Sequence, residues 1–227
     1  MTPEKMKLAL FDLDGTLLPL DSDHAFGEFM VHLGWADAVE HARLNDTFFQ
    51  DYQAGRLDIH AYIDFATDAW RHRSLEDMAW ASQRFMDEVI RPALRDSARD
   101  LVERHRREGD VLAVVTATND FITRPIAQAF GIEHLLATEL ERDDQGRPTG
   151  KVQGTATLRE GKVSRVEQWL TQRGTPASSF ESITFYGDST NDLPLLEWVS
   201  HPVATNPGPA LAAVALQRGW PVLQLFT

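Results

Sequence analysis

The segment Leu8–Leu17, LALFDLDGTL, places two carboxylates directly after an apolar run that is typical of a buried strand. These carboxylates are Asp12 and Asp14, and a glycine and a threonine follow them. An acidic side chain at the end of a buried strand costs several kcal/mol unless its charge is balanced, and a divalent cation is a common way to balance it. The segment therefore predicts a strand that ends at a charged site.

A second acidic cluster stands in the same context far downstream. The apolar run Ile183–Tyr186 is followed by GDSTND, which contains Asp188 and Asp192. In a chain that alternates strands and helices, the carboxyl ends of parallel strands meet at one edge of the sheet. We therefore expect both clusters to form one site, with Mg²⁺ and a phosphate as its contents.

The composition argues against several other classes of protein. The 227 residues can bury a full core, and the net charge of −12 without a basic stripe makes nucleic acid and membranes unexpected partners. The absence of cysteine excludes disulfides, zinc–thiolate sites and thiol nucleophiles. No apolar run approaches the about 18 residues of a membrane span, and Met1–Lys7 lacks a signal-peptide core. We expect a cytoplasmic protein that is a monomer or a homodimer.

Helical periodicity replaces the strand pattern between residues 17 and 90. Apolar stripes at a spacing of three and four residues predict four helices, with Asp58 and Ser74 at the amino-terminal ends of the last two. The stripes begin at Phe26, Phe48, Ile59 and Leu75. Their aromatic side chains are interpreted mainly as helical core, with a pocket only at the ends that face the sheet. We therefore interpret residues 17–90 as a helical bundle inserted after the first strand.

The remaining chain alternates strands and helices. Continuous apolar runs such as Val111–Val115 predict buried parallel strands, and the segments 138–142 and 149–153 predict a hairpin around DDQG. The expected fold class is α/β, a doubly wound Rossmann-like parallel sheet with the helical bundle inserted. In this interpretation residues 1–16 and 91–227 form the core domain and residues 17–90 form a cap domain.

Four short segments carry the polar residues of this pattern. They are DLDGT (Asp12–Thr16), VVTAT (Val114–Thr118), Lys162 at the start of a helix, and GDSTND (Gly187–Asp192). In their order and in the elements that precede them, they resemble the four motifs of the haloacid dehalogenase superfamily of phosphatases, and they span nearly the whole chain. The resemblance implies a Mg²⁺-dependent phosphatase that acts on a small phosphorylated metabolite.

The first motif offers both catalytic carboxylates. Phosphoryl transfer needs a nucleophile in line with the leaving oxygen and a proton for the leaving alkoxide. Asp12 is the candidate nucleophile, because it is the first residue beyond the strand and a carboxylate can form an aspartyl-phosphate. Asp14 lies on the same side of an extended chain and is the candidate general acid, and later the base. The resemblance implies the same roles, with Mg²⁺ held by the Asp12 side chain, the Asp14 carbonyl and Asp188, and with Asp192 in support.

The other motifs offer groups for phosphate and charge. The hydroxyl of Thr116, at a predicted strand end, and the neighbouring backbone N–H groups, that of Ala117 included, are candidate phosphate donors; the alternative for Thr116 is a simple strand-end cap. Lys162 supplies a fixed positive charge that keeps Asp12 ionised beside a phosphate. Asn191 is interpreted as a phosphate or water contact, or as a turn residue.

The helical insertion resembles the cap of the phosphoserine phosphatase-like subgroup, in which an acidic residue nine positions after the nucleophile binds the substrate amine. Asp21 occupies that position and Asp23 is close by, although both can instead cap the helix that begins near His24. The arginine that pairs with the serine carboxylate in the subgroup falls on Ala66 here. The nearby arginines are out of register: Arg56, Arg71 and Arg73. We therefore expect a phosphorylated amine without a carboxylate, such as histidinol phosphate.

Phosphoserine phosphatase activity is the alternative, and three further classes remain open. A dehalogenase would use Asp12 on carbon, but would need neither Asp14 nor the pair Asp188 and Asp192. A phosphomutase would yield a product isomer rather than free phosphate. A non-catalytic binding protein would have no reason to retain all four polar motifs. The pattern favours hydrolysis of a phosphomonoester.

Overall fold

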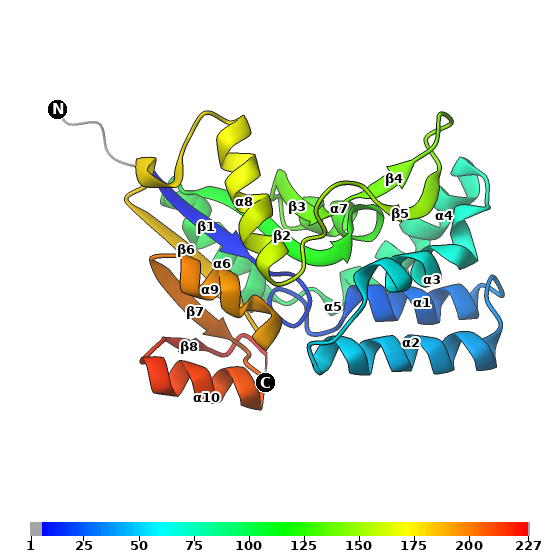
Figure 1. Cartoon of the computed structure of the whole chain (residues 1–227), viewed down its shortest axis with the longest axis horizontal. Helices are drawn as coiled ribbons and strands as arrows, with labels where there is room; N and C mark the ends of the chain where they lie inside the picture. The colour runs from blue at the N-terminus through cyan, green and yellow to red at the C-terminus, as the bar shows by residue number, and fades with distance from the viewer. Residues whose placement is uncertain (1–5, 227) are drawn as a thin grey trace.

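The computed structural model describes residues 6–226. Residues 1–5, part of the expected core domain and of the amino-terminal segment without a signal-peptide core, lie outside the described range, as does Thr227. The described chain forms a parallel sheet in the order β3-β2-β1-β6-β7-β8 (Figure 1). Its strands are β1 (Lys7–Phe11), β2 (Val111–Asn119), β3 (His134–Thr138), β6 (Ser182–Gly187), β7 (His201–Thr205) and β8 (Val222–Leu223). The expected doubly wound α/β fold is confirmed.

Strand β1 lies in the middle of this sheet and pairs with β2 on one side and β6 on the other. Its last residue, Phe11, is in register with Val114 of β2 and Tyr186 of β6. The strand order therefore reverses at β1, and such a switch point is where the loops after the strands separate and leave room for a ligand. Asp12 follows directly at this point.

Helices cover both faces of the sheet (Figure 1). Alternate residues of β1 point to opposite sides, so Ala9 and Phe11 enter one buried cluster while Leu8 and Leu10 enter the other. The first cluster packs against α6 (Asp96–Arg107) and α7 (Asp120–Ala129). The second packs against α8 (Glu160–Gln172), α9 (Leu193–Trp198) and α10 (Pro209–Arg218). The apolar residues of β1, from Leu8 to Phe11, are thereby buried on both sides, as the sequence predicted.

A bundle of helices stands between β1 and β2 in the chain and lies beside the sheet (Figure 1). Its helices are α1 (Ser22–His32), α2 (Ala38–Gln53), α3 (Ile59–Arg71) and α4 (Leu75–Phe85). Asp58 and Ser74 cap α3 and α4 through their side chains, as predicted. A π-helical turn (Met86–Ile90) and the short α5 (Arg91–Ala93) lead back to the sheet. In the described part of the chain, no helix has the length and apolar character needed to cross a membrane.

The predicted hairpin is present and reaches from the sheet to the helical bundle. It pairs β4 (Leu140–Arg142) with β5 (Pro148–Val152) in antiparallel fashion. Gly150 of β5 has a φ of +84°, and a Cβ there would lie 1.9 Å from a guanidinium nitrogen of Arg71 on α3. The close approach of the hairpin to α3 therefore requires glycine at this position. Two short 3₁₀ turns, Ala177–Ser179 and Thr190–Asp192, complete the secondary structure.

One strand boundary differs from the prediction. The apolar run suggested that β2 ends at Val115, but the strand continues to Asn119, with an irregular register against β3 between these two residues. Thr116 therefore lies inside the strand rather than at its end. Polar side chains are tolerated here because they face the edge of the sheet where other polar groups meet them: the Thr118 hydroxyl donates a hydrogen bond to Asp14 at 2.8 Å.

Candidate active site

A buried lysine joins two of the predicted motifs. Lys162, in the first turn of α8, has no exposed surface, and its Nζ donates to Oδ1 of Asp12 at 2.8 Å and to Oδ1 of Asp192 at 2.6 Å. Asp12 follows β1, and Asp192 ends the 3₁₀ turn after β6. Three segments that are distant in sequence are thus joined through one ammonium group.

The charges around Lys162 do not balance. Burial would lower the pKa of Lys162, but its two carboxylate partners outweigh that effect and raise the pKa above its usual range. Burial and repulsion from Asp192 raise the pKa of Asp12 to about 7, although Lys162 acts in the opposite direction. One ammonium group is shared between two carboxylates, and this leaves a net negative charge at the end of β1 for a further cation to balance.

Asp192 uses both of its carboxylate oxygens within the protein. Oδ1 accepts from Lys162, and Oδ2 accepts from the backbone N–H groups of Asp188 at 3.1 Å and Ser189 at 3.3 Å. A Cβ on Gly187 would lie 2.7 Å from Oδ2, so the strand end fits closely around this carboxylate. Asp192 therefore holds the loop after β6 in place.

Asp188 differs, because its Oδ1 is buried without a hydrogen-bond partner. Burial and the charges of Asp12 and Asp192 raise its pKa well above the usual value. Carboxylate oxygens of these three residues lie within 4.8 Å of one another. An orphaned buried oxygen in an all-oxygen, negatively charged cluster fits a hard divalent cation such as Mg²⁺.

The turn after Asp12 requires glycine. Gly15 has a φ of +74°, and a Cβ there would lie 2.3 Å from Oδ2 of Asp188. A larger residue would be strained in its backbone and would push against the acidic cluster. Gly15 thus allows the first and last motifs to approach each other.

Asp14 is held by hydrogen bonds on both oxygens. Oδ1 accepts from the backbone N–H of Ser22 at 2.8 Å, and Oδ2 accepts from the Thr118 hydroxyl at 2.8 Å. Burial and the nearby charge of Asp21 raise the pKa of Asp14 to about 7, against the effect of these hydrogen bonds. A carboxyl group with a pKa near neutrality is suited to both donating and accepting a proton.

A cavity extends from these carboxylates toward the helical bundle. The sheet contributes the edge that carries Asp12 and Asp14, and the bundle contributes aromatic, aliphatic and acidic side chains. The lining residues are Asp12, Asp14, Asp21, Asp23, His24, Asn45, Phe48, Phe49, Tyr52, Leu57, Ile59, Tyr62, Thr116, Ala117 and Thr118. Among these described residues there is no lysine or arginine. The part of the wall that the bundle contributes is therefore mainly apolar, with the carboxylates of Asp21 and Asp23, and it also includes His24 and Asn45.

The two acidic residues of the bundle enter this wall in different ways. Asp21 caps α1, where its Oδ1 accepts from the N–H groups of Asp23 at 3.0 Å and His24 at 2.9 Å. Asp23 is 6% exposed, and burial together with the charge of Asp21 raises its pKa well above the usual value, despite a hydrogen bond with Tyr62. Helix α1 begins at Ser22 and not near His24, so Asp21 alone is the cap.

The architecture and this cluster agree with a comparison against protein families. The family model of the haloacid dehalogenase-like hydrolases matches residues 9–197. The chain belongs to this family.

Relatives of the whole chain support this membership. A histidinol-phosphatase of Neisseria meningitidis serogroup C is 44% identical over 216 residues, which cover 95% of this chain and 97% of that protein. A crystal structure of a protein of unknown function from Bordetella pertussis Tohama I has 46% identity and a TM-score of 0.93, covering 98% of this chain and 100% of that one. A substrate-bound phosphoserine phosphatase has the same fold, with a TM-score of 0.68 at 18% identity over 97% and 93% of the two chains. The protein is a phosphatase of the haloacid dehalogenase family.

The sequence-predicted residues of this phosphatase come together at one sheet edge. Asp12 and Asp192 both accept hydrogen bonds from Lys162, and Asp188 lies beside them. Thr116 is 1% exposed, and its hydroxyl accepts from the backbone N–H of Thr118 at 3.2 Å. Ala117, Asp21 and Asp23 line the adjoining cavity with Thr116.

The side-chain amide of Asn191 is hydrogen-bonded to protein groups on both sides. Its Oδ1 accepts from Nε of Arg159 at 3.2 Å, and its Nδ2 donates to the carbonyl of Tyr52 at 3.0 Å. Both ends of the amide are therefore engaged by protein groups. This geometry favours a bridging role for Asn191 between the sheet and the helical bundle.

Two aromatic residues of the site were interpreted from sequence only as members of helical stripes. Tyr52 of α2 lines the cavity, and burial with the charges of Asp12 and Asp192 raises its pKa well above the usual value. Tyr62 of α3 lies against Asp23. Helical spacing shows which residues share a face, but not which end of that face lies over a separate sheet. The presence of tyrosine among phenylalanines was the available signal, since a buried hydroxyl needs a polar partner.

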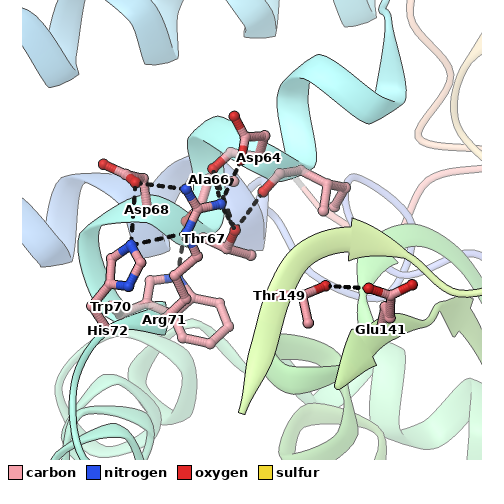
Figure 2. A network of polar contacts seen from close by, with 10 residues as sticks. Asp64, Ala66, Thr67, Asp68, Trp70, Arg71, His72, Glu141 and Thr149 are labelled. Carbon is pink, nitrogen blue, oxygen red and sulfur yellow. Dashed lines mark hydrogen bonds and ion pairs between the residues drawn. The ribbon is translucent and has the colours of Figure 1, made fainter. Parts of the chain in front are cut away.

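The arginines near the expected carboxylate-binding position point elsewhere. Arg71 is bound by Asp64 at 2.5 Å and Asp68 at 2.8 Å, both on its own helix, as Figure 2 shows. Arg56 pairs with Asp51 at 2.7 Å, and the Arg73 guanidinium lies 4.7 Å from the ring centre of Trp35. These contacts leave all three outside the lining of the cavity.

The position inferred for the missing arginine is not a cavity position. The Ala66 carbonyl accepts a hydrogen bond from the Trp70 indole at 2.8 Å (Figure 2), and Ala66 does not line the cavity. Helix α3 contributes Ile59 and Tyr62 instead. Sequence spacing shows which residues share a face of α3. It does not show which turn of the helix lies nearest the cavity, because that depends on how the helix is oriented over the sheet.

Proposed function

We propose that the phosphatase acts through an aspartyl-phosphate. An oxygen of Asp12 attacks phosphorus, and the bond from phosphorus to the substrate oxygen breaks as Asp14 gives that oxygen its proton. Asp14 then takes a proton from water, whose oxygen attacks phosphorus and releases Asp12 and inorganic phosphate. Three features support these roles: Asp12 directly follows the central strand, Asp14 has a pKa raised to about 7, and Lys162 is fixed beside Asp12.

Mg²⁺ is the proposed cofactor. The Asp12 and Asp188 side chains and the Asp14 backbone carbonyl would hold it, and Asp192 would keep the loop of Asp188 in place. When bound, the ion neutralises charge on the phosphate oxygens. Chelation should remove activity and added Mg²⁺ should restore it, while Asp188→Ala should raise the Mg²⁺ requirement or abolish turnover. Full activity in excess EDTA would exclude this cofactor.

Residues 17–90 are proposed to act as a cap domain over the site. This proposal is supported by the cavity that they share with the sheet edge, which is lined both by aromatic side chains of the bundle and by Asp12 and Asp14. A cover of this kind excludes bulk water from the transfer step. It also gives the helical bundle control over which alcohol group is accepted.

The proposed substrate is a phosphorylated amino alcohol, with histidinol phosphate as the best candidate. The observation that carries this proposal is the cavity wall, which has two carboxylates, the half-buried Asp21 and the buried Asp23, and no lysine or arginine among the described lining residues. Carboxylates favour an ammonium group, aromatic rings favour a flat cationic or aromatic ring, and a substrate carboxylate would find no arginine or lysine partner among the described lining residues, where His24 is the basic side chain. The 44% identity to a histidinol-phosphatase over nearly the whole chain supports the same substrate.

A direct comparison of substrates tests this choice. We expect kcat/KM for histidinol phosphate to exceed that for phosphoserine by about 10²-fold or more, since a site built for one charge pattern strongly rejects another. Asp21→Ala should reduce the preference, and Arg56→Ala, a change in an exposed ion pair of the same bundle, should not. A preference for phosphoserine that is lost in Arg56→Ala would overturn the proposal. The cytoplasmic location and the monomeric or dimeric state stay predictions.

A further inference from the structure

A chain of hydrogen bonds ties the helical bundle to the catalytic loops. Nε of Arg159 donates to Oδ1 of Asn191 at 3.2 Å, and Nδ2 of Asn191 donates to the carbonyl of Tyr52 at 3.0 Å. The same carbonyl accepts from the N–H of Gly55 at 3.0 Å. We call Arg159, Asn191 and the Tyr52 carbonyl the clasp. It crosses from the sheet side of the site to the turn between α2 and α3.

Arg159 has a strained backbone conformation and a buried side-chain nitrogen without a hydrogen-bond partner. Its backbone has φ +52° and ψ −117°, a conformation that glycine adopts readily and arginine does not. Its Nη2 is buried without a hydrogen-bond partner, and a Cβ on Gly55 would lie 3.1 Å from that nitrogen. A strained residue whose side chain is pressed against the opposite segment is expected where position matters for function.

Each member of the clasp is next to a residue of the site. Arg159 directly precedes α8, and its carbonyl accepts from the backbone N–H of Lys162 at 2.9 Å. Asn191 is 3% exposed and adjoins Asp192, the other partner of that lysine. Tyr52 lines the cavity with its side chain. A displacement of the α2–α3 turn would therefore be transmitted to both partners of the buried ion pair, Lys162 and Asp192.

We propose that Arg159 and Asn191 are positioning residues, which hold Tyr52 and the α2–α3 turn over the catalytic carboxylates and so set the affinity for substrates that reach the helical bundle. This inference rests on the proposed phosphatase reaction for its kinetic readout only. Asn191 then acts through Tyr52 and not on the phosphate. For substrates too small to contact the helical bundle, KM should depend little on the clasp.

The kinetic test compares two substrates, histidinol phosphate and the much smaller acetyl phosphate. Asn191→Ala removes both hydrogen bonds, whereas Asn191→Asp keeps an acceptor for Arg159 but has no donor for the Tyr52 carbonyl. We expect both variants to raise KM for histidinol phosphate about tenfold and to change KM for acetyl phosphate less than about threefold, the tenfold effect corresponding to one lost hydrogen bond. Arg159→Ala should have a smaller effect in the same direction. Arg56→Ala, in the same turn but outside the clasp, is the matched control.

Hydrogen exchange tests the clasp without any turnover. The amides of residues 53–58 should exchange about tenfold faster in Asn191→Ala and Asn191→Asp than in the wild type, and at the wild-type rate in Arg56→Ala. The proposed role of the clasp would be contradicted by an equal rise in KM for both substrates. It would also be contradicted if neither KM for histidinol phosphate nor the exchange rates changed. A wild-type protein that hydrolyses neither substrate would refute the proposed function alone, since the exchange rates would still decide whether the clasp orders the turn.

Discussion

Two groups of buried and half-buried carboxylates lie close together in this molecule, and their charges are balanced differently. The core carboxylates, at the sheet edge, are Asp12, Asp188 and Asp192. The cavity carboxylates, on the amino-terminal end of α1, are Asp21 and Asp23. The first group contains the ammonium group of Lys162, whereas no lysine or arginine forms an ion pair with the second among the described residues.

This difference separates two uses of buried charge. A cation supplied by the chain is permanent, and it fixes the geometry of the core carboxylates whether or not a ligand is present. Hydrogen bonds alone hold the cavity carboxylates, and their pKa values are raised by burial. Such a group gains most from a ligand that brings its own positive charge. We therefore propose that the first group serves the chemical step and the second group serves substrate recognition.

The largest effect is expected at Asp12. Asp12→Asn keeps the shape of the side chain and one hydrogen-bond acceptor for Lys162, but an amide cannot attack phosphorus as a carboxylate does. Turnover should fall by on the order of 10⁴-fold or more. Release of inorganic phosphate measures this, with the circular dichroism spectrum as the control for folding. Substantial activity in this variant would contradict the covalent mechanism. It would also contradict the proposed role of the core carboxylates in the chemical step.

Asp14→Asn should cost less, roughly 10²–10⁴-fold in kcat, which is the usual contribution of a positioned acid–base group. The amide can still occupy the hydrogen-bonded place beside Ser22 and Thr118, so binding of Mg²⁺ and phosphate should be retained. Rate measurements with substrates of different leaving-group pKa sharpen the test. The loss should be smallest for the most acidic alcohol, and an equal loss for all alcohols would contradict the proton-transfer role.

Lys162→Met tests the permanent cation. The substitution leaves two buried carboxylates without their partner, and breaking a buried pair typically destabilises a protein by about 3–5 kcal/mol. Urea unfolding should therefore show a large drop in the free energy of unfolding. The double variant in which Asp192 is also replaced by Asn should recover part of it. A stable Lys162→Met protein would show that Lys162 does not balance the core group.

Asp23→Asn tests the cavity carboxylates. The substitution should raise the stability of the protein at pH 7 and lower its activity toward histidinol phosphate. The folded-state pKa of Asp23 lies well above the usual 3.8, so the folded state retains this proton to higher pH and the free energy of unfolding declines as pH rises above that value. Asn removes this decline. The variant should unfold at a higher temperature at pH 7, and the gain should vanish below about pH 4.

The same variant should lower kcat/KM for histidinol phosphate by about 10²-fold, with little change for acetyl phosphate. Asp37→Asn, at the exposed cap of α2, is a control outside the cavity. Lower stability at pH 7 would mean that Asp23 already has a stabilising partner in the free protein. The distinction between the two groups would then be wrong.

The clustering of acidic residues at the sheet edge could be predicted from sequence, because each of the strand ends that form it has a clear local pattern. Asp12 and Asp188 each follow a strand whose apolar run is unmistakable, and the parallel arrangement brings such strand ends together. The end of β2 was placed too early, because the prediction required an apolar run, whereas backbone pairing continued through polar residues up to Asn119. Local patterns thus gave the site and missed the extent of one of its strands.

The cavity side was less predictable, since it depends on how the helical bundle lies over the sheet. Tyr52, Tyr62 and Asn191 meet the site through contacts between segments far apart in sequence. The periodicity of α3 is equally compatible with Ala66 or Tyr62 facing a ligand, and the structure places Tyr62 there. The sequence argument for the substrate used Ala66, which does not line the cavity, so the preferred substrate stays a prediction.

The complete burial of Lys162 also decides how this protein responds to amine-directed reagents. The sequence has four lysines, and Lys7 and Lys151 are exposed while Lys162 has no surface at all. Its amine is held protonated by two carboxylates, and a protonated amine cannot attack an activated ester. Dyes, biotin and solid supports coupled through lysine will therefore attach elsewhere on the molecule. A phosphatase immobilised in this way should keep the ammonium group of Lys162 unmodified for as long as it stays folded.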